Sequence, residues 1–120
     1  MDMSKTNILA RSLKPAVFHI LLALDGRDSY GYAMMQTVRE QSGGQVPIQT
    51  GSFYRHLARL IEDELVAEAA APRGRVDPRR GAHYRLTPRG AQALAAEKAR
   101  LADLVAAIGL ARRPSKKGTA

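Results

Sequence analysis

The sequence contains no cysteine, which excludes disulfide bonds and thiolate metal sites. Its three histidines, His19, His56 and His83, are scattered along the chain. The sequence also lacks a Gly-rich phosphate-binding loop and paired carboxylates at a plausible site. This inventory argues against an enzyme, and it predicts neither a bound metal ion nor any other cofactor.

Long apolar runs are also missing from the sequence. The longest, ILLAL at residues 20–24, is too short to span a bilayer. The N-terminal stretch MDMSKTNILARSLKP lacks the apolar segment of a signal peptide. We therefore expect a cytoplasmic protein with no membrane partner.

Acidic residues are scarce in this chain. There are 11 Asp and Glu against 19 Lys and Arg, which gives a formal net charge of +8 and a pI of about 10.4. A small, strongly basic domain indicates a polyanionic partner, most often nucleic acid, and a merely soluble surface is the alternative. With 120 residues, 45% of them hydrophobic, the chain suits one folded domain.

Hydrophobic patterns predict two helices in the first third of the chain. The first begins near Leu13, because Pro15 is tolerated only in the first turn of a helix, and it ends at an Asp-Gly pair. Residues 1–12 form an arm or a short helix before it. The second helix is capped by Asp28 or Ser29 and ends at a Gly-Gly pair.

A third helix follows Thr50, whose hydroxyl can cap its start. Its apolar residues have the spacing of one buried helical face. They are Phe53, Leu57, Leu60 and Ile61.

A β-hairpin is predicted next. Its strands are LVAEAAA and AHYRL, joined by the Pro-, Gly- and Arg-rich loop PRGRVDPRRG. In the second strand, Tyr84 and Leu86 alternate inward around Arg85. Three helices followed by a hairpin form a winged helix-turn-helix domain over residues 13–86, in which the third helix reads the DNA major groove.

A long last helix completes the predicted fold. Thr87 and Pro88 provide a capping hydroxyl and a favoured first helical residue. The helix covers residues 87–111, and residues 112–120 form a flexible basic tail. The predicted class is mainly α, an α+β winged helix-turn-helix with a C-terminal dimerisation helix.

Four stretches resemble the PadR family of bacterial transcriptional regulators, and in particular its short subfamily. They are ILLALDG, YGYAMMQTV, TGSFYRHLARLIEDELV and HYRLTPRGAQAL. In the third, Ser52 and Phe53 replace the family's Thr and Leu. The resemblance covers about residues 15–110.

The resemblance implies a homodimeric repressor of transcription that binds double-stranded DNA at a pseudo-palindromic operator. It also implies derepression by a small apolar or aromatic effector, such as a phenolic acid or a cytotoxic drug. Some relatives stack an aromatic drug on a tryptophan at the dimer interface, and this chain contains no tryptophan.

The third helix carries the candidate DNA contacts. Arg55 has no acid at i+4, and in a major groove it can reach a guanine. Arg59 contacts DNA less freely, because Asp63 lies at i+4. The alternative for both is a solvated face. Ser52 either binds a phosphate or caps the helix, and Tyr54 either bonds a phosphate or packs at the edge of the core.

The charges of this helix run against its macrodipole, which favours acids at the N-terminus and cations at the C-terminus. Its cations come first, and Glu62, Asp63 and Glu64 come last. A helix that enters DNA with its N-terminal half requires this order, because the acids then point away from the phosphates.

The wing and the last helix supply the remaining candidate site residues. Clustered arginines on the wing fit phosphate or minor-groove contacts, and solubility is the alternative. These arginines are Arg73, Arg75, Arg79 and Arg80. An apolar stripe on the last helix requires a partner, either a second copy or the chain's own first helix. The stripe consists of Leu94, Leu101, Leu104, Val105 and Ile108.

The sequence thus predicts a sequence-specific, dimeric DNA-binding repressor. The alternative function is a winged helix that serves as a protein-interaction or DNA-architectural module without operator specificity.

Overall fold

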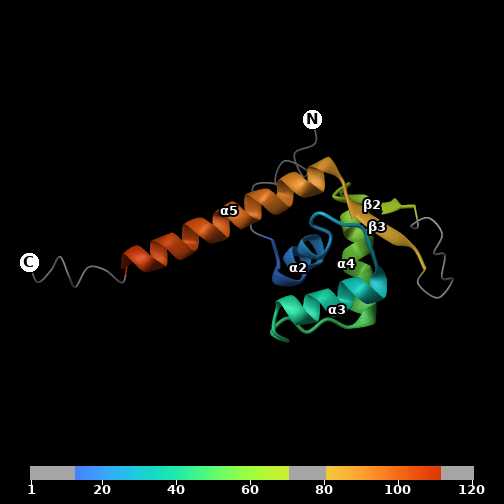
Figure 1. Ribbon diagram of the computed structural model, residues 1–120, viewed down its shortest axis with the longest axis horizontal. Helices are drawn as coiled ribbons and strands as arrows, with labels where there is room; N and C mark the ends of the chain where they lie inside the picture. Colours follow the sequence, from blue (N-terminus) through green and yellow to red (C-terminus); the bar gives the residue numbers. More distant parts are fainter. Residues whose placement is uncertain (1–12, 71–80, 112–120) are drawn as a thin grey trace, which may run out of the picture.

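The computed structural model describes residues 13–70 and 81–111 and shows a mainly helical α+β fold, which confirms the predicted class (Figure 1). The elements in chain order are α2 (Pro15–Ala23), β1 (Ser29–Tyr30), α3 (Gly31–Gln41), α4 (Thr50–Glu62), β2 (Val66–Ala69), β3 (His83–Leu86) and α5 (Pro88–Ala111). The predictions for the arm at residues 1–12, the wing loop and the tail at residues 112–120 fall largely or wholly outside the described residues.

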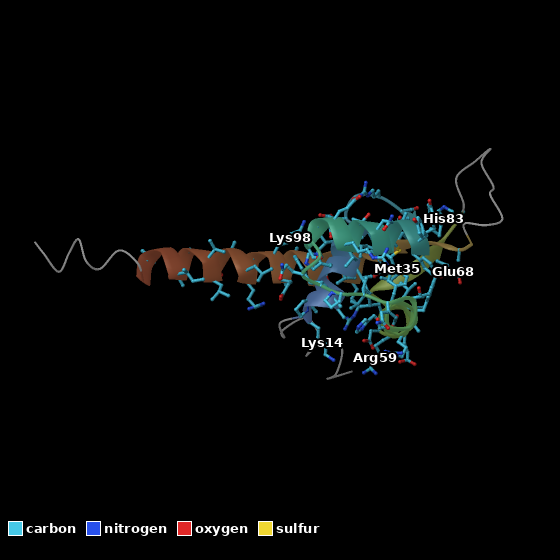
Figure 2. The ribbon with its side chains drawn as sticks, turned by 90° about the horizontal axis from the view of Figure 1, so that it is seen from below. Lys14, Met35, Arg59, Glu68, His83 and Lys98 are labelled. Carbon is cyan, nitrogen blue, oxygen red and sulfur yellow. The ribbon has the colours of Figure 1, made fainter. Side chains whose placement is uncertain are left out.

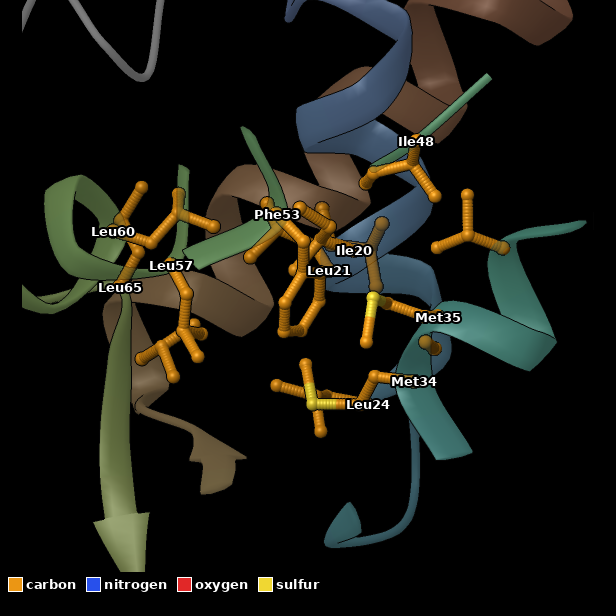
Figure 3. Close-up of a cluster of buried hydrophobic side chains, with 14 of the residues drawn as sticks. Ile20, Leu21, Leu24, Met34, Met35, Ile48, Phe53, Leu57, Leu60 and Leu65 are labelled. Atoms are coloured by element: carbon orange, nitrogen blue, oxygen red, sulfur yellow. The ribbon is translucent and has the colours of Figure 1, made fainter. Parts of the chain in front are cut away.

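One hydrophobic core holds the helices together. Phe53 of α4 is fully buried and lies at the centre of the cluster in Figure 3. Leu57 and Leu60 of the same helix lie on one side of it, and Met34 and Met35 of α3 lie on the other. Because α2 and the first half of α5 contribute to the same core, the three N-terminal helices cannot be separated from α5 without exposing apolar surface.

The start of α3 differs from the sequence prediction. Neither Asp28 nor Ser29 caps this helix: Tyr30 is its N-cap residue, and the helix begins at Gly31. Ser29 and Tyr30 instead form the short strand β1, which pairs with β3. A two-residue strand has no detectable alternation in a sequence, because its pairing depends on a segment more than fifty residues away.

Helix α4 agrees with its predicted apolar face at three of four positions. Phe53, Leu57 and Leu60 are buried, but Ile61 is 38% exposed, so its assignment to the buried face was wrong. The N-cap residue is Gln49, and Thr50 is the first helical residue rather than the cap. A shift of one residue at a helix end is small, yet it places Ser52 in the third helical position.

The hairpin belongs to a three-stranded antiparallel sheet with the order β1-β3-β2. Val66 pairs with Leu86, and Ala69 pairs with His83. Tyr84 and Leu86 pack against the core while Arg85 is exposed, as predicted. Because β1 directly precedes α3, its pairing with the central strand fixes the base of the hairpin to the start of this helix.

The junction between the hairpin and α5 is tied to the end of α4. The N–H of Thr87 donates to the Leu65 carbonyl (3.1 Å), and the Thr87 hydroxyl donates to the Glu64 carbonyl (2.7 Å). The same hydroxyl accepts a hydrogen bond from the N–H of Gly90 (2.9 Å), which confirms the predicted cap. Gly90 is buried, and a Cβ atom there would lie 1.9 Å from the Leu65 carbonyl oxygen.

Helix α5 projects beyond the rest of the molecule. Figure 1 shows its first turns beside the sheet and its C-terminal half extending away from the other elements. Although α5 is the longest helix described, neither it nor any other helix in residues 13–70 and 81–111 is apolar over a length that could cross a membrane.

Replacing Gly90 by Ala should destabilise the fold, because the new methyl group would collide with the backbone of Leu65. Overpacking of this kind typically costs about 1–3 kcal/mol. Gly109 of the same helix has open space around its Cα, so Gly109→Ala is the matched control and should be neutral or stabilising by up to about 1 kcal/mol. Thermal unfolding followed by circular dichroism measures both, and equal melting temperatures for the two variants would contradict the role of the junction.

Candidate nucleic-acid interface

Arg55 is an exposed cation on the outer side of α4. Its residue is exposed, whereas Phe53 and Leu57 face the core. Within the described residues, no acidic side chain forms an ion pair with Arg55. A guanidinium with this freedom can offer two parallel donors to an acceptor pair such as the O6 and N7 of guanine.

Arg59 is held within its own helix. Its Nε lies 3.4 Å from the Oδ2 of Asp63, and the arginine side chain is 74% exposed. This is the i, i+4 pair that the sequence predicts. An exposed pair of this kind is weak, so Arg59 can exchange Asp63 for a phosphate. The acids that follow lie at the C-terminal end of α4 and beyond it, about two turns or more from Arg55 and Ser52.

His56 of α4 is partly buried. Partial burial lowers its pKa from the usual value, and the charges of Lys14 and Arg55 lower it further. The charge of Lys14 at the start of α2 thus acts on this part of α4. In Figure 2, Lys14 and Arg59 extend from the same edge of the molecule. Sequence reasoning missed Lys14, because nothing in the spacing of residues places position 14 beside positions 55 and 56.

Ser52 is engaged in closing the start of α4. Its hydroxyl donates to the Gln49 carbonyl (3.0 Å) and accepts from the Gln49 N–H (3.3 Å). These two bonds connect the N-cap residue with the third helical residue, as in a capping box. The arrangement favours the capping role of Ser52 over direct binding of a phosphate.

Tyr54 packs against the start of α3. Its ring meets Phe53 edge to face, with centroids 4.9 Å apart, and 45% of the residue remains exposed. A Cβ atom on the buried Gly31 would lie 2.3 Å from the Tyr54 hydroxyl oxygen. Gly31 of α3 and Tyr54 of α4 thus form one close contact. This favours packing at the edge of the core as the role of Tyr54.

The structure describes the predicted apolar stripe of α5 but not the predicted wing arginines. Arg73, Arg75, Arg79 and Arg80 lie outside the described residues. Leu94 is 2% exposed and belongs to the core of its own chain. The rest of the stripe is open: Leu101 is partly exposed, Leu104 is 48% exposed, Val105 67% and Ile108 53%.

The stripe on α5 therefore has a covered half and an uncovered half. With about 100° per residue, Leu94, Leu101 and Ile108 lie on one side of the helix. α2 packs against α5 in the fold, whereas Leu104, Val105 and Ile108 remain exposed in the half of α5 that projects from the molecule in Figure 1. Packing against the first helix and pairing with a partner are thus compatible, because they use different turns of α5.

Three packed helices, a sheet with a hairpin and an exposed cationic face on the third helix define a winged helix-turn-helix protein. The model of the transcriptional regulator PadR-like family matches residues 20–96. The chain belongs to this family and is a DNA-binding transcriptional regulator.

Solved structures show the same fold. A PadR family transcription regulator from Clostridium difficile has a TM-score of 0.68 and 22% identity, with 81% of this chain and 97% of that chain covered. A transcriptional regulator from Clostridium thermocellum has a TM-score of 0.60 and 24% identity, with coverage of 78% and 84%. Pex from Synechococcus has a TM-score of 0.53 and 18% identity, with coverage of 85% and 99%. No match is found among curated proteins.

The contact between Gly31 and Tyr54 can be tested by a pair of substitutions. Gly31→Ala should lower stability by about 1–3 kcal/mol, because the methyl group overlaps the Tyr54 hydroxyl. In a Tyr54→Phe background the same substitution should cost less, since the hydroxyl oxygen is absent, although the ring carbon at 3.1 Å keeps part of the penalty. Urea unfolding of the four proteins gives the coupling energy, and strictly additive effects would show that the two residues do not meet.

Proposed function

We propose that the protein is a homodimeric repressor that binds a pseudo-palindromic operator in double-stranded DNA and blocks transcription from a nearby promoter. The observation that carries this proposal is the exposed cationic face of α4, where Arg55 has no acidic partner among the described residues. Family membership supports the same reading. The proposed place of action is the cytoplasm.

The distribution of charge on α4 supports entry into the groove by its N-terminal half. Arg55 lies within the first two turns of α4, and the positive charge of Lys14 acts on the same part of the helix. Asp63 follows the last helical residue, Glu62. A polyanion attracts the first end of this helix and repels the other, so the charge order favours one orientation on DNA.

The uncovered half of α5 supports a dimer. Four apolar residues there, Leu104, Val105, Ile108 and Leu110, are between 48% and 67% exposed. Two copies that pair along this stripe would place two α4 helices on one duplex, which matches an operator with two half-sites. A small apolar or aromatic effector stays a prediction, with the paired stripes as its proposed binding site.

The roles of α4 and the wing separate in one DNA titration. Arg55→Ala should lose sequence discrimination, at about 1–3 kcal/mol on genomic fragments selected by the wild-type protein and less on random DNA. Arg79 and Arg80 are proposed to meet phosphates. Replacing both by Ala should weaken binding to both DNAs alike and reduce the salt slope by about 0.9 per lost contact.

If Arg55→Ala weakens binding to both DNAs equally while the Arg79 and Arg80 variant loses sequence discrimination, the wing and not α4 reads the DNA sequence. If the wild-type protein prefers no sequence at any salt concentration, the architectural alternative replaces the repressor. Specific complexes should survive salt that removes non-specific ones.

The dimer interface is tested by adding charge to each side of α5. Leu101→Asp together with Val105→Asp should give monomers, since two carboxylates would be buried at the interface. Ala99 and Ala106 lie on the opposite side of the helix and are exposed, so their replacement by Asp adds the same charge as a control. Light scattering should report monomers for the first variant and dimers for the second. A dimer in both would locate the interface elsewhere.

A further inference from the structure

One turn of α5 carries a buried ion pair. Glu97 is only 4% exposed, although it is charged. Arg100 binds it with two hydrogen bonds, from Nε to Oε1 at 3.0 Å and from Nη2 to Oε2 at 2.7 Å. These bonds hold the pKa of Glu97 below its usual value, against the opposing effect of burial. Because a buried carboxylate is costly unless it is paired in this way, the turn tolerates few other arrangements.

The neighbouring residue ties the same turn to the end of α2. Nζ of Lys98 forms an ion pair with Oδ2 of Asp25, which lies just beyond the last residue of α2. Figure 2 shows Lys98 at the place where α5 leaves the rest of the molecule, and residues 102–110 of the helix are all exposed. Glu97, Lys98 and Arg100 thus form a polar turn at the border between the packed half of α5 and its projecting half.

Apolar packing alone defines the tilt of a helix less well than such a turn. Ala93 and Leu94 fill the core one turn earlier on α5, and apolar side chains can repack against each other in several similar ways. Charged groups require a particular partner in a particular direction. A single polar residue in a contact between helices can therefore fix its register, at a cost in stability.

The position of the polar turn gives it leverage over the far end of α5. Lys98 lies about 12 Å along the helix from Gly90, and Ala111 lies about 20 Å beyond Lys98. With the junction at Gly90 fixed, a shift of about 1 Å at Lys98 moves the far end by about 3 Å. In a symmetric dimer both copies move, so the two α4 helices change their separation by about 5–6 Å, which exceeds the rise of one base pair, about 3.4 Å.

We propose that the polar turn of α5 is a positioning element that sets the tilt of this helix against the DNA-binding part of the chain. It thereby sets the spacing between operator half-sites that the dimer accepts. The proposal rests on the function proposed above, because it requires a dimer that pairs through α5 and reads two half-sites. The polar turn acts through the direction of α5 and needs no contact with DNA.

The experiment measures affinity for DNA duplexes that carry two copies of a half-site, which the wild-type protein selects from genomic fragments. The spacer between the two copies grows in steps of one base pair. The wild-type protein should prefer one spacing. The quantity of interest is the spacing ratio, the affinity at this spacing divided by the affinity at the next. Changes in stability or in overall charge alter binding at all spacings alike and leave this ratio unchanged.

Glu97→Met together with Arg100→Met replaces the buried pair by apolar side chains of similar length. Such a replacement is often neutral or stabilising, so the melting temperature should equal or exceed that of the wild type. The spacing ratio should nevertheless fall by at least about fivefold, the lower end of typical couplings between two sites of one protein. A loss of stability with an unchanged ratio would overturn the proposal, since the pair would then have only a structural role.

Lys98→Met and Asp25→Asn break the second contact with opposite changes of net charge. Both should reduce the spacing ratio, whereas a purely electrostatic effect would weaken binding in the first and strengthen it in the second at every spacing. Lys98→Arg keeps a cation for Asp25 and should retain the wild-type ratio. Because the side chains of Lys98 and Asp25 are 47% and 45% exposed, these variants should fold even if the double Met variant does not.

Asp103→Asn is the matched control, because it removes a charge from the exposed, projecting half of α5. Light scattering establishes that each variant has the wild-type oligomeric state. Wild-type ratios for the variants at Lys98 and Asp25, or an equal reduction for Asp103→Asn, would overturn this inference alone. A wild-type protein that binds one half-site as tightly as any pair of half-sites would overturn the proposed dimeric repressor as well.

Discussion

The carbonyl group of Leu65 is the point on which the arrangement of the fold depends. It lies directly after α4, accepts a hydrogen bond from the start of α5, and leaves no room for a side chain on Gly90. The preceding residue, Glu64, has a positive φ of 64°, which is unfavourable for a residue with a side chain, and the Thr87 hydroxyl binds its carbonyl. The end of α4, the base of the hairpin and the start of α5 are thereby joined within a few residues. The direction of α5 relative to α4 follows from this junction.

Local chemistry made most of the fold predictable. The apolar spacing in α4, the Thr-Pro start of α5 and the inward alternation of Tyr84 and Leu86 are properties of neighbouring residues, and the structure confirms them. The errors have a different origin. Strand β1 depends on pairing with β3, which is distant in sequence, so local periodicity cannot reveal it. Ile61 follows the apolar spacing of α4 but is 38% exposed.

In the candidate site too, features set by neighbouring residues were predictable and features set by distant segments were not. The pairing of Arg59 with Asp63 could be predicted, because both residues lie on one helix at a spacing of four. Lys14 could not, since its charge acts on His56 of α4 from a part of the chain distant in sequence. Tyr54 illustrates the intermediate case. The sequence motif that contains Tyr54 was recognisable. Only the close approach of the Tyr54 hydroxyl to Gly31 explains why this motif occurs together with the one that contains Gly31.

The placement of Ala93 and Leu94 in the core has a consequence for the synthesis of the protein. These residues close the core over α2, yet a ribosome makes them only after α4 and the whole hairpin. Until then α2 lacks the contacts that α5 makes with it. Folding of the DNA-binding half must therefore wait for the second turn of α5, although that helix looks like a separate appendage. A chain that stops at Leu86 would contain every element of the winged helix and still expose its core.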